Sequence, residues 1–167
     1  MDATDRYALE LSAELGGLLR ERGWNCATAE SCTGGLIGSW ITSLAGSSDY
    51  FPGGIVAYSN GAKTRLLGVS QSTLDAVGAV SRECALEMAS GARQAFNAQI
   101  GISSTGIAGP GGATARKPVG LIYVAAATPD RSEVRELYLD GDRLRNIHES
   151  AVAALELTLD AMRPDPS

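Results

Sequence analysis

Histidine and metal-binding cysteine patterns are almost absent from this sequence of 167 residues. It contains one histidine, His148, and its three cysteines form no CxxC pair. A metal site built from imidazoles or thiolates needs more ligands than these, so we expect no metal and no cofactor. The unpatterned cysteines fit a reducing compartment better than a disulfide framework. A Ser-His pair would have His148 as its single candidate base.

Clustered positive charge and long apolar runs are missing as well. Lys and Arg number 14 against 19 Asp and Glu, a formal net charge of −5. Phosphate backbones demand clustered positive charge, so we expect no nucleic-acid partner. No apolar run is long enough to span a bilayer, and residues 1–6 have no signal-peptide core. We therefore expect no membrane association and a cytoplasmic location.

What remains is the composition of an ordinary folded domain, with 44% hydrophobic and 20% charged residues. This length suits one domain with a core of its own. We expect that domain to span residues 1–163. Pro164 and Pro166 cannot continue a helix, so residues 164–167 are expected to form a frayed tail.

Helical and strand patterns alternate along the chain. Apolar spacing, a stop at Gly23 and a capping serine at Ser81 predict an α/β fold. Helices should cover both faces of a mixed, mostly parallel sheet whose adjacent last strands are antiparallel. The predicted helices are 5–22, 36–44, 62–67, 81–97 and 144–162, and the predicted strands are 25–29, 53–58, 100–105, 119–128 (the longest) and 133–139.

The segment Thr28-Ala29-Glu30-Ser31-Cys32-Thr33-Gly34-Gly35 is a predicted strand-to-helix turn, the place where α/β folds hold ligands. Ser31 or Thr33 could serve only as the helix N-cap. Alternatively, the two glycines in the first helical turn allow a ligand to approach backbone N–H groups, which suit a phosphate or an oxyanion. Cys32 is a rival nucleophile, although a small buried thiol is its commoner role.

The segment from Gly54 to Lys63 places Tyr58 at the end of a strand and Lys63 at the start of a helix. They could equally be a half-buried aromatic and a solvated surface charge. Gly61-Ala62-Lys63-Thr64 is not a phosphate-binding P-loop, because the Gly-Lys adjacency is broken and the upstream glycine spacing is wrong. The Tyr-Lys spacing of five, without a GxGxxG turn, also argues against a dinucleotide oxidoreductase.

A third segment, Ser104 to Gly112, is dense in glycine and is followed by Lys117-Pro118-Val119-Gly120. It could be a mobile connection between strands. It could also present a nest of backbone amides to an anion.

Together these segments resemble the CinA C-terminal domain family over nearly the whole chain and in the same order. The matching motifs are Thr28–Gly35, Tyr58-Ser59-Asn60 with Ala62-Lys63, Gly78-Ala79-Val80-Ser81, Gly106-Ile107-Ala108-Gly109-Pro110 and Lys117-Pro118-Val119-Gly120. The resemblance implies a three-layer α/β/α sandwich, similar in architecture to anticodon-binding domains. It also implies hydrolysis of the carboxamide of nicotinamide mononucleotide, giving nicotinate mononucleotide and ammonia.

The resemblance implies a nucleophile at Ser31 with Tyr58 and Lys63 as its partners. Such a set can work without histidine if the lysine or the tyrosine loses its proton more easily than a free side chain would. Desolvation lowers the pKa of a lysine, and a neighbouring cation lowers that of a tyrosine. Which of the two is the base stays open. An acyl-enzyme and an oxyanion held by backbone amides are expected.

Substrate-binding residues are expected in the turns that border the pocket. Arg143, in a Gly-Asp-Arg signature that resembles the family's, is a candidate phosphate contact, or else pairs with a nearby carboxylate. Gly61 stands where the family commonly has Glu, which could alter rate and specificity. The expected substrate-binding set is Thr33, Gly34, Gly35, Thr105, Gly106, Ala108, Gly109 and Arg143.

Two other functions remain possible from the sequence. The domain could bind a pyridine nucleotide as a sensor without turnover, or it could act on a different amide or phosphorylated ligand. The presence of all three candidate catalytic side chains favours an enzyme. We also expect a homodimer.

Overall fold

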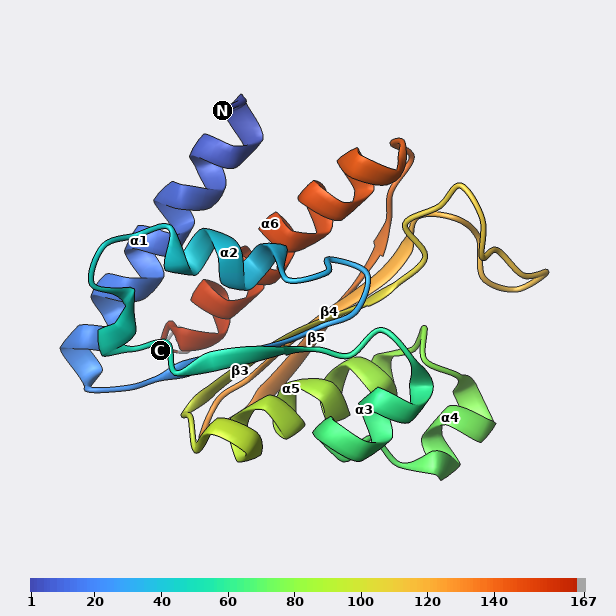
Figure 1. Ribbon diagram of the computed structural model, residues 1–167, viewed down its shortest axis with the longest axis horizontal. Coiled ribbons are helices and arrows are strands. Elements are labelled where there is room, and N and C mark those ends of the chain that lie inside the picture. The colour runs from blue at the N-terminus through green and yellow to red at the C-terminus, as the bar shows by residue number, and fades with distance from the viewer. Residues whose placement is uncertain (165–167) are drawn as a thin grey trace.

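Five strands form one sheet in the order β2-β1-β3-β4-β5 in the computed structural model, which describes residues 1–164 (Figure 1). β1 pairs in parallel with β2 and β3, whereas β3–β4 and β4–β5 are antiparallel. Four of the five strands therefore run in one direction, which confirms the mixed, mostly parallel sheet. The strands are β1 (Cys26–Glu30), β2 (Gly53–Val56), β3 (Ile100–Gly106), β4 (Leu121–Ala127) and β5 (Ser132–Tyr138).

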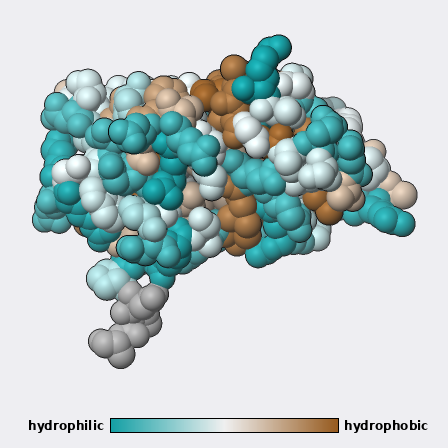
Figure 2. Space-filling model, turned by 90° about the horizontal axis from the view of Figure 1, so that it is seen from below, coloured by the Kyte–Doolittle hydropathy of each residue, from teal (hydrophilic) through white to brown (hydrophobic). Residues whose placement is uncertain are grey.

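Helices cover both faces of this sheet, so the expected three-layer α/β/α sandwich is confirmed (Figure 1). One layer contains α1 (Ala3–Arg22), α2 (Leu36–Thr42) and α6 (Arg143–Met162). The other contains α3 (Asn60–Leu67), α4 (Gln71–Val77) and α5 (Arg82–Phe96). Each layer buries its own apolar cluster against the sheet. Figure 2 views the molecule from the side of the second layer, which is mostly hydrophilic with hydrophobic residues gathered near its middle.

Local sequence signals set several helix ends where we expected them. Gly23 ends α1 in the left-handed region with a φ of 63°, a conformation that glycine adopts without steric cost. The Ser81 hydroxyl accepts a hydrogen bond from the backbone N–H of Cys84 and so caps α5. These two predictions are confirmed.

The structure corrects the predicted elements at four places. Helix α4 and a short 3-10 helix at Ser47–Asp49 were not expected, although Ser70 caps α4 much as Ser81 caps α5. Strand β2 ends two residues before Tyr58. Strand β4 is no longer than β3 or β5, because Gly120 turns the chain with a φ of +91° just before it begins.

The connections diverge at β1 and β3, whose carboxyl ends are therefore the expected place of a ligand crevice. The chain leaves β1 through α2 on one face, and it leaves β2 through α5 on the other face to reach β3. Neighbouring parallel strands whose connections diverge in this way open a crevice at their carboxyl ends. Ser31 follows β1, and Gly106 is the last residue of β3.

No helix within residues 1–164 combines the length and apolar character needed to cross a bilayer. Of the expected tail at 164–167, only Pro164 lies within the described residues.

Candidate active site

Ser31 lies at the start of a tight turn between β1 and α2. Its backbone N–H donates to the carbonyl of Ser104, 2.9 Å away, which continues the pairing of β1 with β3 by one residue. The serine is 8% exposed, so it is nearly buried at this end of the sheet.

The two glycines of this turn have a different role from the expected one. Gly34 and Gly35 precede α2 and do not belong to its first turn, and their φ values of 60° and 102° require glycine. Their backbone N–H groups are not free donors: Gly34 donates to the carbonyl of Ser31, and Gly35 donates to the carboxylate of Glu30. Neither Ser31 nor Thr33 is the N-cap, which is Gly35. The placement of these glycines in the first turn of α2 is therefore wrong, and their own N–H groups are not the donors that this turn offers to a ligand.

Lys63 is buried beside Ser31, which excludes the reading of it as a surface charge. Its Nζ lies 2.9 Å from the Oγ of Ser31 and 2.9 Å from the carbonyl oxygen of Ala57, and only 2% of the residue is exposed. Within residues 1–164 no carboxylate forms an ion pair with it. Burial without a carboxylate disfavours the charged form, so desolvation lowers the pKa of Lys63 below its ordinary value. Its amine is thus placed and tuned to exchange a proton with Ser31.

The other sequence candidates for base or nucleophile lack this arrangement. His148 Nδ1 lies 3.6 Å from Asp5 Oδ1, and the imidazole ring packs edge-on against Trp40. Neither contact involves Ser31. Burial raises the pKa of Cys32 to about 12, which makes its thiolate scarce and supports the reading of a small buried side chain.

Tyr58 is paired with Arg143 and not with Lys63. The residue is 63% exposed, and its hydroxyl oxygen lies 3.0 Å from the donating Nη2 of Arg143. Nη1 of the same guanidinium donates to the carbonyl of Gly109 at 2.8 Å. Arg143 is the first residue of α6, so this contact joins three chain segments, those that follow the carboxyl ends of β2, β3 and β5. Among residues 1–164 Arg143 forms no ion pair with a carboxylate, which was the alternative interpretation.

The loop after β3 supplies part of that rim, held by buried polar contacts. The side-chain amide of Asn146, which is 0% exposed, donates to the carbonyl of Ala108, and Gly109 precedes a cis bond to Pro110. A side chain at Gly106 would collide with Ile122 of β4. Thr105 donates its hydroxyl to the carbonyl of Ala79, so its hydroxyl hydrogen is already committed within the protein.

Two features of the turn were not predicted from the sequence. One is Glu30, whose buried carboxylate accepts four hydrogen bonds from the turn and from α2. The Glu three residues before Thr33 was part of the motif, but nothing in its spacing indicated that it folds back onto the chain. The other is that the backbone N–H groups of Cys32 and Thr33 donate to no acceptor in the part of the chain that the structure describes. Free amides directly after a nucleophile are suited to stabilising an oxyanion.

Gly61, where the family commonly has Glu, lies at a position with open space around it. It is exposed in the first turn of α3, and a side chain built on it would meet nothing within 4 Å. The glycine leaves the Ser31–Lys63 contact intact.

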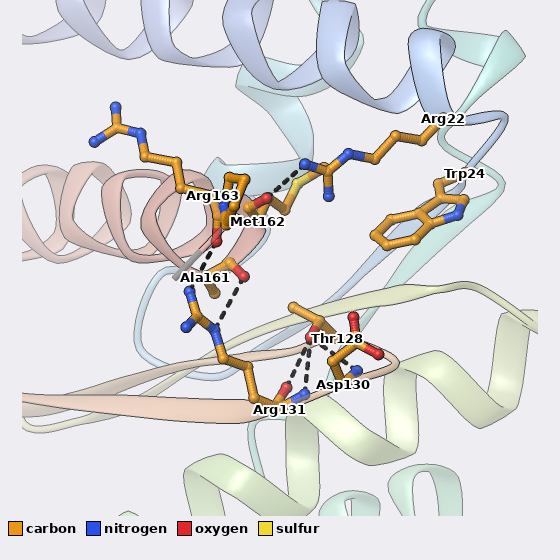
Figure 3. Close-up of a pocket in the computed structure, with 9 residues that line it drawn as sticks. Arg22, Trp24, Thr128, Asp130, Arg131, Ala161, Met162 and Arg163 are labelled. Carbon is orange, nitrogen blue, oxygen red and sulfur yellow. Dashed lines mark hydrogen bonds between the residues drawn. The ribbon is translucent and has the colours of Figure 1, made fainter. Parts of the chain in front are cut away.

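A second concave region, with a volume of about 280 Å³, lies at the opposite end of the sheet (Figure 3). It is lined in part by Thr128, the residue after β4, whose last residue pairs with the start of β3. Its arginines are engaged with the protein: Arg22 donates to the carbonyl of Met162, and Arg131 donates to that of Ala161. No group of three potential metal ligands occurs in either region or elsewhere within residues 1–164.

A model of the CinA C-terminal domain matches residues 8–162 of the chain. A putative competence-damage inducible protein of Halothermothrix orenii is 56% identical over 138 residues, which are 81% of this chain and 33% of that protein. A CinA-like protein of Kosmotoga olearia is 48% identical over 147 residues, 88% of this chain and 36% of that protein. The chain thus spans about a third of the length of these curated relatives.

Solved structures agree with this likeness. The competence/damage inducible protein CihA from Agrobacterium tumefaciens superposes with a TM-score of 0.91 at 40% identity, over 94% of this chain and 96% of that one. A CinA superfamily protein from Escherichia coli gives a TM-score of 0.90 at 29% identity, over 97% of this chain and 94% of that one. The likeness therefore covers nearly the whole chain.

Proposed function

The chain belongs to the CinA C-terminal domain family, and from this premise we propose that it is an amidohydrolase that converts nicotinamide mononucleotide to nicotinate mononucleotide and ammonia. The observation that carries the proposal is the 2.9 Å contact between Ser31 Oγ and the buried Nζ of Lys63. A serine hydroxyl is a poor nucleophile unless a base removes its proton. A lysine that is buried without a carboxylate partner has a lowered pKa, so it can act as such a base at a pH below the pKa of free lysine.

In the first half of the reaction, neutral Lys63 takes the hydroxyl proton as Ser31 Oγ bonds to the carboxamide carbon. The carbonyl oxygen becomes an oxyanion, and the free N–H groups of Cys32 and Thr33 are the donors that the turn offers it. When the carbonyl re-forms, the C–N bond breaks and Lys63 returns the proton to the leaving nitrogen, which departs as ammonia. Ser31 is left as an acyl ester.

In the second half, water takes the place of ammonia. Lys63 accepts one proton of the water while its oxygen bonds to the acyl carbon. Collapse of this second oxyanion breaks the bond to Ser31 Oγ, and the proton on Lys63 returns to the serine. The free acid leaves, and the enzyme regains its starting protonation state.

The substrate is proposed to lie in the crevice with its phosphate toward Arg143. Arg143 is held by Tyr58 and the carbonyl of Gly109, which orients its planar group at the rim. An oriented guanidinium is suited to a phosphate. Tyr58 then acts at the rim by holding Arg143 and contacting substrate, and Lys63 acts as the base.

A sensor that binds a pyridine nucleotide without turnover is the alternative. A binding site has no use for a buried lysine aimed at a serine, because burying that amine opposes its charged state and destabilises the fold. The Ser31–Lys63 contact therefore favours the enzyme. The homodimer stays a prediction from the family resemblance.

The test is ammonia release from nicotinamide mononucleotide, with a chelator present, by the native protein and by Ser31→Ala. We expect release by the native protein and a loss of at least about 10³-fold in Ser31→Ala. Ser39→Ala, an exposed serine of α2, is the matched control and should keep native activity. Near-native activity of Ser31→Ala would end the covalent mechanism. Nucleotide binding without ammonia release by the native protein would support the sensor.

A further inference from the structure

Glu30 is a buried carboxylate that the proposed chemistry does not use. It is the last residue of β1 and is 1% exposed, yet within residues 1–164 it forms no ion pair with a basic side chain. Its charge is instead met by hydrogen-bond donors. Oε2 accepts from Thr33 Oγ1 at 2.6 Å, from Gly35 N at 3.0 Å and from Ile37 N at 3.1 Å, and Oε1 accepts from Gly38 N at 2.8 Å.

These bonds tie the two ends of the Ser31 turn together. The carboxylate comes from the residue before Ser31, and three of its donors are backbone N–H groups at the start of α2, those of the N-cap Gly35 and of Ile37 and Gly38. Helix α2 has no side-chain cap at Gly35, so Glu30 takes that role from the strand. The turn is also held to the next strand, because Thr33 Oγ1 lies 2.6 Å from Ser104 Oγ and Ser31 N donates to the carbonyl of Ser104.

The distribution of donors follows from this arrangement. Glu30 accepts hydrogen bonds from the N–H groups of Gly35, Ile37 and Gly38. Among the described residues, the N–H groups of the turn that remain without an acceptor are those of Cys32 and Thr33. The helix N-terminus is thus neutralised by the protein's own carboxylate and does not compete for an anionic group of the substrate.

We propose that Glu30 is the positioning residue of this site: it holds the turn so that Ser31 Oγ faces Lys63 Nζ and the Cys32 and Thr33 amides remain available to the oxyanion. This rests on the proposed function for its substrate, but the geometry of the nucleophile can be tested without that substrate. The role needs a carboxylate in particular, because four donors approach two acceptor oxygens.

Glu30→Gln tests this requirement with almost no change of shape. The glutamine has one acceptor oxygen, and its NH₂ group would face at least one N–H or O–H that now donates to Glu30. The turn must then shift to satisfy the orphaned donor. A displacement of about 1 Å at a reacting group lowers rates by roughly 100-fold.

Glu87→Gln is the matched control. Glu87 accepts from the backbone N–H of Ser70 at 2.8 Å and from the Thr73 hydroxyl at 2.6 Å, so it is also a carboxylate that closes a helix N-terminus, here that of α4. Its hydrogen bonds among the described residues go to Ser70 and Thr73, and none reaches the Ser31 turn. The two variants should lose stability alike, while only one alters the nucleophile.

Three measurements separate positioning from folding: the rate of Ser31 labelling by a small alkyl fluorophosphonate, kcat and KM for ammonia release, and the melting temperature. We expect Glu30→Gln to slow labelling and kcat by roughly 10- to 100-fold with KM within about twofold. Glu87→Gln should keep both rates. Native labelling by Glu30→Gln, or equal losses in both variants, would overturn the proposal.

Failure of the amidase proposal gives a different pattern. A native protein that is labelled at Ser31 but releases no ammonia would refute the substrate and retain the positioning role, provided that Glu30→Gln is labelled slowly. A native protein that is not labelled at Ser31 would overturn both. If Glu30→Gln does not fold, Thr33→Val and Thr33→Ser take its place. The valine removes a donor to Glu30 and should slow labelling, whereas the serine retains the hydroxyl and should restore it.

Discussion

At each end of the sheet a charged side chain binds the unpaired backbone groups of a helix terminus, and the sign of the charge differs between the two ends. At the amino end of β1 and β3, Arg22 and Arg131 donate to the last carbonyls of α6, which carry partial negative charge (Figure 3). At the carboxyl end, Glu30 accepts from the first amides of α2, which carry partial positive charge. Each end places a side chain of the sign that its helix terminus favours.

Burial is what makes these ends different. The side chain of Arg131 is 30% exposed and has Glu133 as an ion-pair partner at 3.0 Å, so water and a counter-charge stabilise it. Lys63 is 2% exposed and has no such partner among the described residues. A charge that is solvated or paired remains inert, whereas a buried amine gives up its proton readily. Helix termini are thus capped at both ends of the sandwich, but only the carboxyl end also buries an unpaired amine, the one to which we assign the proposed chemistry.

The largest effect should come from removing the reactive amine. Lys63→Met keeps the length and apolar character of the side chain, and we expect kcat to fall by roughly 10²- to 10⁴-fold because the base is lost. The melting temperature at neutral pH should rise, since the fold no longer buries an amine. Arg65→Met, which removes an exposed cation of the same helix, is the control and should change neither quantity. A small loss of kcat in Lys63→Met would show that another group is the base.

The pH profile sharpens the difference between buried and solvated charge. Lys63 acts as a base only when neutral, so kcat/KM should rise with pH through the lowered pKa of Lys63 and level off below the pKa of free lysine. The unfolded chain binds more protons in this range, so the contribution of Lys63 to the free energy of unfolding also rises with pH there. Tyr58→Phe should keep the midpoint of the rate profile. A profile that Tyr58→Phe abolishes would assign the base to the tyrosine.

A smaller and selective effect is expected at the rim of the crevice. Arg143→Ala should lower kcat/KM for the nucleotide by roughly 10-fold or more and change that for the riboside less, because only the nucleotide has a phosphate. Arg145→Ala removes an exposed arginine of the same helix turn, one that pairs with Glu149 at 2.7 Å, and is the matched control. Equal losses on nucleotide and riboside would argue against a phosphate contact.

At the amino end of β1 and β3, a substitution should change stability alone. Arg131→Ala removes donors to the carbonyls of Asp160, Ala161 and Arg163. We expect a loss of about 1–3 kcal/mol in the free energy of unfolding, measured by urea titration, with native kcat. Arg65→Ala should leave the midpoint unchanged, since that guanidinium bonds to no helix end in the part of the chain described. A loss of kcat in Arg131→Ala would mean that the two ends are coupled.

The linear order of the sequence was enough to predict most of the fold. Apolar spacing and capping signals gave the alternation of helices and strands, including the stop at Gly23 and the start at Ser81. Helix α4 was missed, although it has a capping serine at Ser70, because its seven residues provide too little apolar periodicity. Strand ends were wrong where one backbone angle decided them, as at Gly120.

The sequence by itself also supplied the candidate site residues, because its motifs resemble those of the family in type and order. Ser31, Lys63, Tyr58 and Arg143 were all identified from their motifs. Their partners were decided only by the tertiary structure. Burial and the approach of distant segments brought Lys63 to Ser31, Arg143 to Tyr58, and the Glu30 carboxylate to the amides of α2. Protonation and hydrogen bonding depend on the solvent and dipoles around a group, and these exist only after the layers have packed.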